Sequence, residues 1–577
     1  MMFKKALTFL MAAALCCSAF AGCGQEAEPS SNIAEPQTSS SSEGNSLLNE
    51  PGVLPLVTQP VTLNIGLIEN TLISDYNDNT LTNWLEEQTG ISLEFTLYPT
   101  NGDEARQKLE LAITAKQDLP DILMGFGLNA VVRDKYGEDG ILTELTPYYD
   151  SEDDSYYLHQ MLQKTEESGT CVTGTAADEW ELIKRYTTSP NGSIYVFPNY
   201  APAQVDMWDG RWYINKNWLD KLGMDYPKTT DDLYHVLKAF KTQDPNGNGK
   251  QDEIPLVGSG TGWRQQPVIL LLNSFLYCPY DYKTVENGMI SLAYTQDAYR
   301  EGLRYIRKLV QEDLFPAISF TQDGAQLKAL LDIPADQDST VGFWVGSPTG
   351  LFSVDNSHKT EYSGDFDIIQ GPEGVAYTPK TNPNVGGNTY ITKDCENPQV
   401  AYRFLTFFAN EETALRGRFG EKGVNWDYVE DGAKGLYESM GIPALFWQDN
   451  AIWGTTNNVI WGGPMMLQPS YMNEGSEASK ILNDPLASLG MIAKAVGHLY
   501  GNAPKDTVPN LIYTSEELEE LSELEATIST YAKESQTRFL TGDLDIEADW
   551  DSYLKELDNM GLSDYLKIMQ AAYDRMK

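Results

Sequence analysis

Residues 61–98 read VTLNIGLIENTLISDYNDNTLTNWLEEQTGISLEFTLY, and this stretch decides the fold class. At both of its ends apolar residues alternate with polar ones, a period of two that predicts strands. Between the ends, Leu81, Trp84 and Leu85 follow helical spacing, and Gly90 closes the helix. The stretch therefore predicts a β-α-β unit.

The same pattern repeats directly downstream. Ala105, Leu109 and Ile113 lie on one face of a second predicted helix, which leads to the apolar run at 122–124. Repeated strand-helix alternation predicts a parallel sheet with right-handed crossovers, so we expect an α/β lobe. The folded part begins near residue 54, which leaves about 520 residues, enough for two large lobes rather than one core.

The amino terminus predicts export. Lys4 and Lys5 precede an apolar run at 6–20 that is too short to span a bilayer, as in a secretory signal. A small pair then leads into Cys23, which resembles the lipobox of bacterial lipoproteins. The resemblance implies a signal peptide at 1–22, acylation of Cys23 and anchoring outside the cytoplasmic membrane of a Gram-positive-type cell. The alternative is ordinary secretion with a free cysteine.

Composition limits the partners and the means of stabilisation. Residues 23–53 are polar, and their serine-rich core lacks aromatic side chains, so we expect a flexible tether. The chain has 83 acidic and 41 basic residues and a formal net charge of −42, which excludes nucleic acid and anionic lipid surfaces as partners. Cys171, Cys278 and Cys395 are far apart in the chain and form no disulfide framework or metal-ligand spacing.

Residues 244–255 read DPNGNGKQDEIP and predict a calcium loop. Oxygen-bearing side chains fall at loop positions one, three, five and nine, with Gly249 at the sharp turn at position six. Pro255 stands where a calcium hand places glutamate, so no exiting helix is expected and the ion acts as a structural clip. The expected ligands are Asp244, Asn246, Asn248, Lys250 through its carbonyl, Asp252 and Glu253. The alternative is an Asn-Gly-rich turn without metal.

A longer run around this loop carries a family resemblance. The pattern NWLDKLGxxxPxTxxDL begins at Asn217, and KAFxxxDPNGNGKxDEIPL begins at Lys238. Together they resemble the extracellular solute-binding lipoproteins of bacterial sugar importers, nearest to the large calcium-loop subgroup similar to alginate-oligosaccharide binders. Segments at 84–95, 119–122 and 397–408 agree with it. The resemblance extends from the signal to residue 428.

The resemblance implies a two-lobed periplasmic-binding-protein-like fold of type II, with a hinge between two α/β lobes that close on a ligand. It assigns residues 54–198 and 385–423 to the first lobe. Residues 199–384 and 424–577, with the calcium loop, form the second. Leucine spacing after residue 515 predicts that an acidic helix and further helices cover the second lobe.

A sugar site requires aromatic faces beside hydrogen-bonding groups. This chain has 12 Trp and 32 Tyr, and several Trp lie in glycine-rich segments where a ligand can approach. The alternative for each of these tryptophans is that it packs between its loop and the core and does not contact a ligand. The candidate ligand-binding residues are Trp263, Trp344, Trp426, Trp453, Trp461, Arg264, Asp427 and Asn388.

Catalytic motifs are missing from the sequence. Its four histidines show no HxxxH spacing, and no GxSxG motif occurs, so we expect that the protein is not an enzyme. The leading hypothesis is a monomeric receptor that passes an oligosaccharide to the membrane subunits of an ABC importer. The alternatives are the same fold binding a peptide or another small solute, and a secreted glycan-active enzyme.

Overall fold

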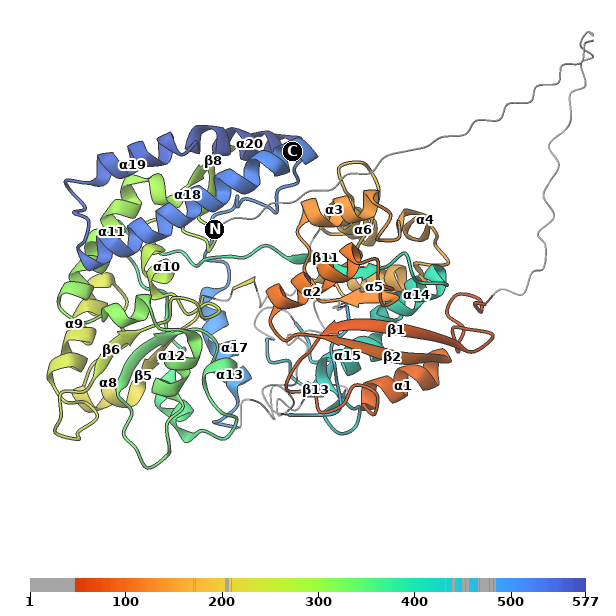
Figure 1. Ribbon diagram of the computed structural model, residues 1–577. Coiled ribbons are helices and arrows are strands. Elements are labelled where there is room, and N and C mark those ends of the chain that lie inside the picture. The colour runs from red at the N-terminus through yellow and green to blue at the C-terminus, as the bar shows by residue number, and fades with distance from the viewer. Residues whose placement is uncertain are drawn as a thin grey trace, which may run out of the picture. The chain divides into compact units, whose positions relative to one another are not determined.

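The computed structural model describes residues 47–169, 171, 173–202, 207–208, 210–430, 432–437, 442–448, 452, 456–464, 466, 477, 481 and 484–577. The predicted signal peptide, Cys23 and Trp453 lie outside the described residues. The residues from Leu47 to Lys577 form one compact unit. Figure 1 shows its helices and strands.

The first sheet contains the predicted β-α-β unit. Its strand order is β2-β1-β3-β11-β4, with β1 parallel to β2 and to β3, and β11 antiparallel to β3 and β4. The strands are β1 (Val61–Ile68), β2 (Ile91–Tyr98), β3 (Ile122–Met124), β4 (Phe197–Ala201) and β11 (Asn384–Ile391). The predicted strands and their parallel arrangement are confirmed.

Helices cover this first sheet (Figure 1). In α1, the Asn79 side chain accepts a hydrogen bond from the Leu81 amide, and Gly90 takes a left-handed φ of 73° that ends the helix as predicted. The helices are α1 (Thr80–Thr89), α2 (Gly102–Thr114), α3 (Ala130–Glu138), α4 (Thr146–Tyr149), α5 (Tyr156–Glu167), α6 (Ala176–Thr187), α14 (Pro398–Thr406) and α15 (Glu411–Phe419).

The second sheet has the order β10-β5-β9-β6, and its β6 and β9 strands are parallel. Its strands are β5 (Trp212–Asn215), β6 (Ile254–Val257), β9 (Val341–Val345) and β10 (Tyr362–Ser363). The helices around it are α8 (Lys216–Leu222), α9 (Thr230–Thr242), α10 (Pro267–Leu272), α11 (Asp297–Gln311), α12 (Gly324–Leu331) and α13 (Pro348–Leu351). The expected Thr229–Asp232 capping box begins α9.

The tail is helical, as predicted. It forms α17 (Ser488–Leu499), α18 (Ser515–Thr541), α19 (Trp550–Asn559) and α20 (Leu562–Arg575). The long acidic helix α18 packs on α11, and α20 contacts a hairpin of β7 (Lys283–Glu286) and β8 (Met289–Leu292). The tail therefore forms an outer layer over helices as well as strands.

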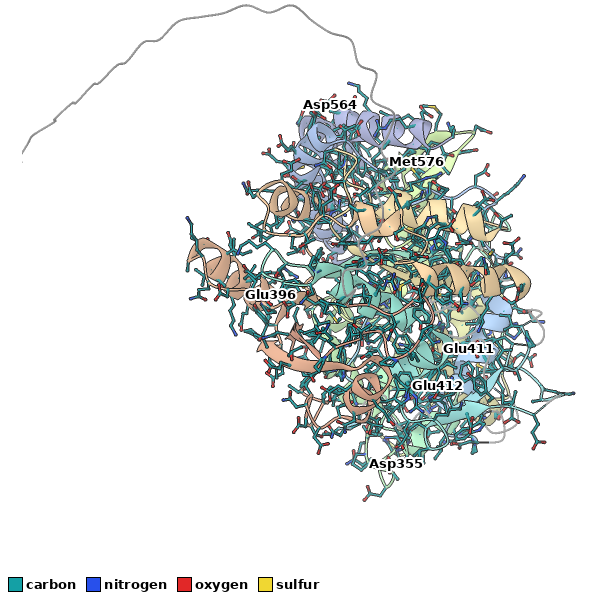
Figure 2. The ribbon with its side chains drawn as sticks, turned by 90° about the vertical axis from the view of Figure 1, so that its right-hand side faces the viewer. Asp355, Glu396, Glu411, Glu412, Asp564 and Met576 are labelled. Carbon is teal, nitrogen blue, oxygen red and sulfur yellow. The ribbon has the colours of Figure 1, made fainter. Side chains whose placement is uncertain are left out.

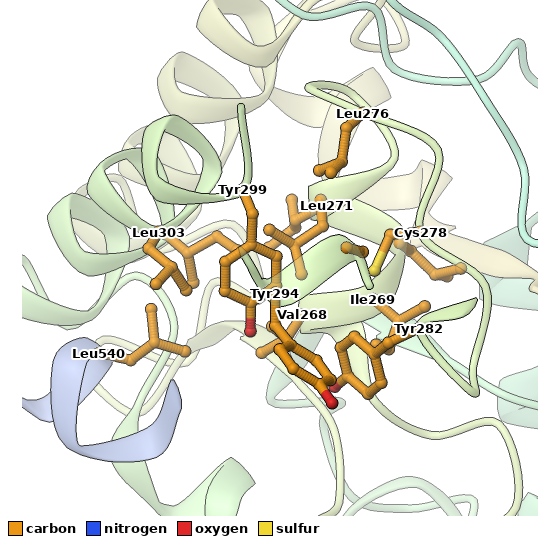
Figure 3. Packing of buried hydrophobic residues seen from close by; sticks show 14 of the residues in the cluster. Val268, Ile269, Leu271, Leu276, Cys278, Tyr282, Tyr294, Tyr299, Leu303 and Leu540 are labelled. Atoms are coloured by element: carbon orange, nitrogen blue, oxygen red, sulfur yellow. The ribbon is translucent and has the colours of Figure 1, made fainter. Parts of the chain in front are cut away.

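Separate cores lie under the two sheets. Figure 3 shows part of the second, where Leu271, Tyr299 and Leu303 meet Leu540 of α18. The first core includes Ile65, Leu85 and Phe404, and also Trp461 from a late segment. The lobe boundaries at residues 198, 384 and 423 stay a prediction.

A short ladder lies beside α15, with β12 (Trp426–Tyr428) pairing antiparallel to β13 (Phe446–Gln448). Acidic side chains such as Asp355, Glu396 and Asp564 point outward from the surface (Figure 2). Of the described helices, none has the length and apolar composition needed to cross a bilayer.

Candidate functional site

The loop between α9 and β6 turns its polar side chains toward one another. The Asp244 carboxylate accepts hydrogen bonds from the amides of Gly247 and Gly249, at 3.0 and 3.1 Å. The carboxamides of Asn246 and Asn248 donate to Asp252 at 3.0 and 3.1 Å. Because φ is 78° and 73° at the two glycines, the chain turns tightly enough for this convergence. Side chains at loop positions one, three, five and nine therefore meet on one side of the turn.

Glu253 places a buried carboxylate in this loop. The residue is 4% exposed, and its Oε1 has no hydrogen-bond partner among the described residues. Burial raises the pKa of Glu253, and the nearby carboxylates of Asp244 and Asp252 raise it further. A buried carboxylate beside like charges is costly unless a cation compensates it.

The donor set fits a hard cation such as Ca²⁺. It consists of carboxylate, carboxamide and carbonyl oxygens, without sulfur or nitrogen. Within the described part of the chain, no three His, Cys, Asp or Glu side chains gather closely enough to hold a metal by themselves. A cation in this loop therefore needs Asn246, Asn248 and the Lys250 carbonyl as well.

The other end of β6 carries an exposed aromatic ring. Ligands of open α/β sheets bind beyond the carboxyl ends of the strands. In the loop that follows β6, Trp263 is 57% exposed. The Arg264 guanidinium carbon lies 5.7 Å from the centroid of the Trp263 ring and 3.8 Å from that of Tyr280. This loop presents a flat ring beside hydrogen-bond donors, which suits a sugar.

Further aromatic rings extend this surface, and the sequence analysis missed them. Tyr277 lies 5.9 Å from Tyr377 between ring centroids, and its hydroxyl donates to the Lys380 carbonyl at 3.4 Å. The Lys380 ammonium is 5.8 Å from the Trp208 ring, which lies 5.8 Å from that of Tyr500. We call Trp208, Trp263, Tyr277, Tyr280, Tyr377 and Tyr500 the aromatic surface.

A cavity of about 390 Å³ opens in this surface, and Arg264, Tyr277, Lys380, Asn382 and Asn510 are among its lining residues. The exposed members of the surface share a sequence signal, since Tyr500 precedes Gly501 and Tyr377 follows the glycine-containing turn near residue 374. The predicted aromatic candidates were all tryptophans in glycine-rich segments, so these tyrosines were not among them.

Three of the predicted tryptophans have no open ring face. Trp344 is fully buried and stacks on Tyr213 with ring centroids 4.3 Å apart. Trp426 is fully buried, and its Nε1 donates to the Gly420 carbonyl at 2.9 Å. Trp461 is 6% exposed and packs in the first core. Their glycine neighbours allow close packing, so in this structure these rings fill the core.

Two predicted polar residues lie within strands, Asn388 in β11 and Asp427 in β12. The Asn388 carbonyl accepts a hydrogen bond from the Gly125 amide at 3.0 Å, directly after β3, and its side chain accepts one from Asn199 at 3.2 Å. Asn388 therefore lies at the carboxyl end of a parallel strand, where a ligand contact is expected. Asp427 pairs with Trp447 in the β12–β13 ladder, and its side chain accepts a hydrogen bond from the neighbouring Tyr428 amide at 2.8 Å.

One serine, histidine and glutamate set resembles a catalytic triad in composition only. The His358 Nδ1 lies 3.1 Å from Ser339 Oγ and 2.7 Å from Glu361 Oε1, while Nε2 lies 3.0 Å from the Pro334 carbonyl. A triad needs the serine and the carboxylate on opposite ring nitrogens, but here both share Nδ1. Both Ser339 and His358 are also buried. This set is therefore structural.

The sequence profile of bacterial extracellular solute-binding proteins matches residues 72–415. The chain belongs to this family. The fructooligosaccharide ABC transporter substrate-binding protein FusA of Streptococcus pneumoniae serotype 4 is 26% identical over 527 residues, covering 87% of this chain and 88% of FusA. The family predicted from the sequence is confirmed.

Solved structures of family members share the fold. An EF-hand mutant of S. pneumoniae FusA in complex with fructo-nystose superposes with a TM-score of 0.67 at 23% identity, over 89% of this chain and 99% of that one. Alginate-binding protein AlgQ2 without calcium ion gives 0.59 at 20% identity, over 90% and 99% of the two chains. The predicted α/β periplasmic-binding-protein-like fold is confirmed.

Proposed function

We propose that the protein is a cell-surface receptor that captures an oligosaccharide and delivers it intact to an ABC-type sugar importer. Family membership gives an extracellular solute-binding protein, and the FusA likeness along nearly the whole chain supports a carbohydrate ligand. The observation that carries the proposal is Trp263, a ring 57% exposed beside Arg264 at the carboxyl end of β6. Exposed indole next to hydrogen-bond donors is the chemistry of sugar recognition.

Different residues of the proposed sugar site would make different contacts with the ligand. Trp263 offers a face for the C–H groups of a sugar ring, while Arg264 offers donors for hydroxyl oxygens. Asn388, at the end of β3, supplies a second set of polar contacts from the other sheet. Two lobes that close around the ligand make contacts that only the closed state provides, so the sugar stabilises closure.

A structural Ca²⁺ is part of the proposal. Asp244, Asn246, Asn248, Asp252 and Glu253 with the Lys250 carbonyl would hold it, and the buried Glu253 supports this assignment. The ion would supply charge compensation and would tie the end of α9 to β6. The name of the FusA EF-hand mutant is consistent with such a loop in the family.

Anchoring completes the proposal. The signal at 1–22 would be removed and Cys23 acylated, so that residues 23–53 tether a monomer to the outer face of the membrane. Mass spectrometry of the mature protein tests this: a diacylglyceryl mass on Cys23 is expected, and Cys23→Ala should release the protein into the medium. An unmodified Cys23 at the mature amino terminus contradicts it.

Calorimetry with a panel of glycans and peptides tests the ligand class. The panel includes kestose, nystose, alginate oligosaccharides, milk oligosaccharides and short peptides. We expect heat from at least one glycan and none from peptides. Incubation of the bound glycan with the protein, followed by chromatography, should return it unshortened. Heat only from a peptide supports the alternative solute, and shortened glycan supports an enzyme.

A further inference from the structure

A hollow in the second lobe brings together three lysines that form no ion pair with a described carboxylate. Lys216 begins α8, Lys359 lies in the turn before β10, and Lys494 lies on α17. All three line a cavity of about 150 Å³. No carboxylate of the described chain lies within ion-pair distance of any of these ammonium groups. We call this the three-lysine pocket.

This grouping is unusual because acidic residues outnumber basic ones two to one in the chain. Lysines elsewhere form ion pairs with these acidic residues: Lys164 lies 2.8 Å from Glu411, and Lys283 lies 3.0 Å from Glu525. Three ammonium groups around one hollow, against the single lining carboxylate of Asp484, give it a local positive potential.

Lys359 is the decisive member. The residue is 2% exposed, and among the described residues its side chain makes one hydrogen bond, from Nζ to the Val354 carbonyl at 2.6 Å. An ammonium has three donors and loses its hydration on burial, so a single carbonyl does not compensate it. Burial lowers the pKa of Lys359 despite the field of Asp484, which also lines the pocket. The geometry leaves donors that can face a ligand.

The backbone adds to the positive potential. Ala487, Gly490 and Met491, from the start of α17, line the same hollow. This twelve-residue helix has no side-chain cap at its first residue, so the positive end of its dipole favours an anion there. The Gly490 and Met491 amides donate to the Ala487 carbonyl, and the Asp484 carboxylate accepts from the Leu486 amide just before the helix. Ser363 also lines the hollow, and its hydroxyl, which accepts from the Asp365 amide at 3.1 Å, keeps a proton to donate.

We propose that the three-lysine pocket binds a small oxyanion of the phosphate or carboxylate type. The cavity accepts one such ion with a few waters and is too small for a polymer. Bound there, the anion neutralises Lys359 and bridges α17 to the turn before β10. This site is separate from the aromatic surface, so it does not depend on the sugar proposal.

Inorganic phosphate is the probe. The mature protein, in chloride buffer of constant ionic strength, is titrated with sodium phosphate and followed by calorimetry and by melting temperature. We expect saturable binding and a rise in Tm that sodium chloride does not produce. In a Lys216→Gln/Lys494→Gln double variant, neither replaced side chain is fully buried, so we expect the protein to fold. This variant should bind phosphate at least about tenfold more weakly because two charge-assisted contacts are lost.

Two further variants make the test selective. Lys228→Gln/Lys555→Gln removes the same charge from exposed lysines elsewhere and should bind phosphate like the parent. Lys359→Met should abolish binding; if it does not fold, the double variant still decides. The proposal is overturned if phosphate acts no more strongly than chloride, or if the Lys216/Lys494 double variant binds as tightly as the control.

Discussion

The loops at the two ends of strand β6 differ in what their side chains face. The incoming loop turns Asp244, Asn246 and Asp252 toward one another around a tight turn. The outgoing loop turns Trp263 out to solvent, 57% exposed. The polar side chains of the incoming loop thus contact one another or a bound ion, whereas the outgoing loop presents an exposed ring that a ligand can contact. The carboxyl end is the end at which open α/β sheets bind ligands.

The strand next to β6 sharpens this contrast. Trp344 pairs in register with Val257, yet it is fully buried, whereas Trp263 six residues beyond Val257 is exposed. Both tryptophans have nearby glycines in the sequence. The difference is that Trp344 lies inside a strand between Tyr213 and Phe352, while Trp263 lies past the strand end.

The largest expected effect is from Trp344→Ala. Removing a fully buried indole leaves a cavity beside Tyr213, so unfolding free energy should fall by about 3–5 kcal/mol. Urea unfolding followed by circular dichroism measures this. Glycan affinity of the folded fraction should stay at the parent value. A stable Trp344→Ala protein that has lost glycan binding would reverse the roles given to the two tryptophans.

Removal of calcium from the incoming loop ranks second. A ligand at a hundred times its Kd stabilises a fold by about 2.7 kcal/mol, so chelation should lower Tm by a few degrees. Glycan binding should persist, since the loop lies at the opposite end of β6. Glu253→Gln should weaken the calcium response, and exposed Glu286→Gln is the matched control. Unchanged Tm after chelation, with no calcium in the purified protein, contradicts the metal assignment.

Trp263→Ala should produce the converse of Trp344→Ala. We expect glycan affinity to fall about tenfold or more from loss of the stacking face, with stability within about 0.5 kcal/mol of the parent. Calorimetry and urea unfolding of the same preparation check both values. Met289→Ala removes another exposed apolar side chain, 64% exposed on β8, and should leave both values unchanged.

The smallest effect is expected from pH. Burial opposes the charged form of His498, but hydrogen bonds at 2.9 Å to Asp365 and Asp367 outweigh it and raise the pKa. A raised folded pKa means that this stabilisation is complete below the unfolded pKa and is lost as pH rises through the folded one. Tm should therefore fall modestly across neutral pH, and His498→Gln should flatten that slope. An equal slope in His498→Gln contradicts the assignment.

Much of the fold follows from local sequence, because several signals agree on it. Alternation at 61–67, the Gly90 stop and the Thr229–Asp232 capping box each specify a local structure that the tertiary packing keeps. Pro255 likewise predicts that the calcium-type loop does not enter a helix, and β6 follows it.

The ligand surface could be predicted only in part. Glycine neighbours do not distinguish Trp263 from Trp344, because glycine serves close packing as well as ligand approach. The apolar run VGFWV around Trp344 is a better guide, since a continuous apolar stretch predicts a buried strand. Tyr377 and Tyr500 join the aromatic surface through contacts between distant segments, which a single sequence does not reveal.

A crystal structure of the protein with the tightest glycan of the panel tests the central claim most directly. We predict a sugar ring stacked on the Trp263 indole, with Arg264 donating to its hydroxyls and no contact between the sugar and the incoming loop of β6. A glycan bound with Trp263 free in solvent, and with no contact to the aromatic surface, would contradict this account.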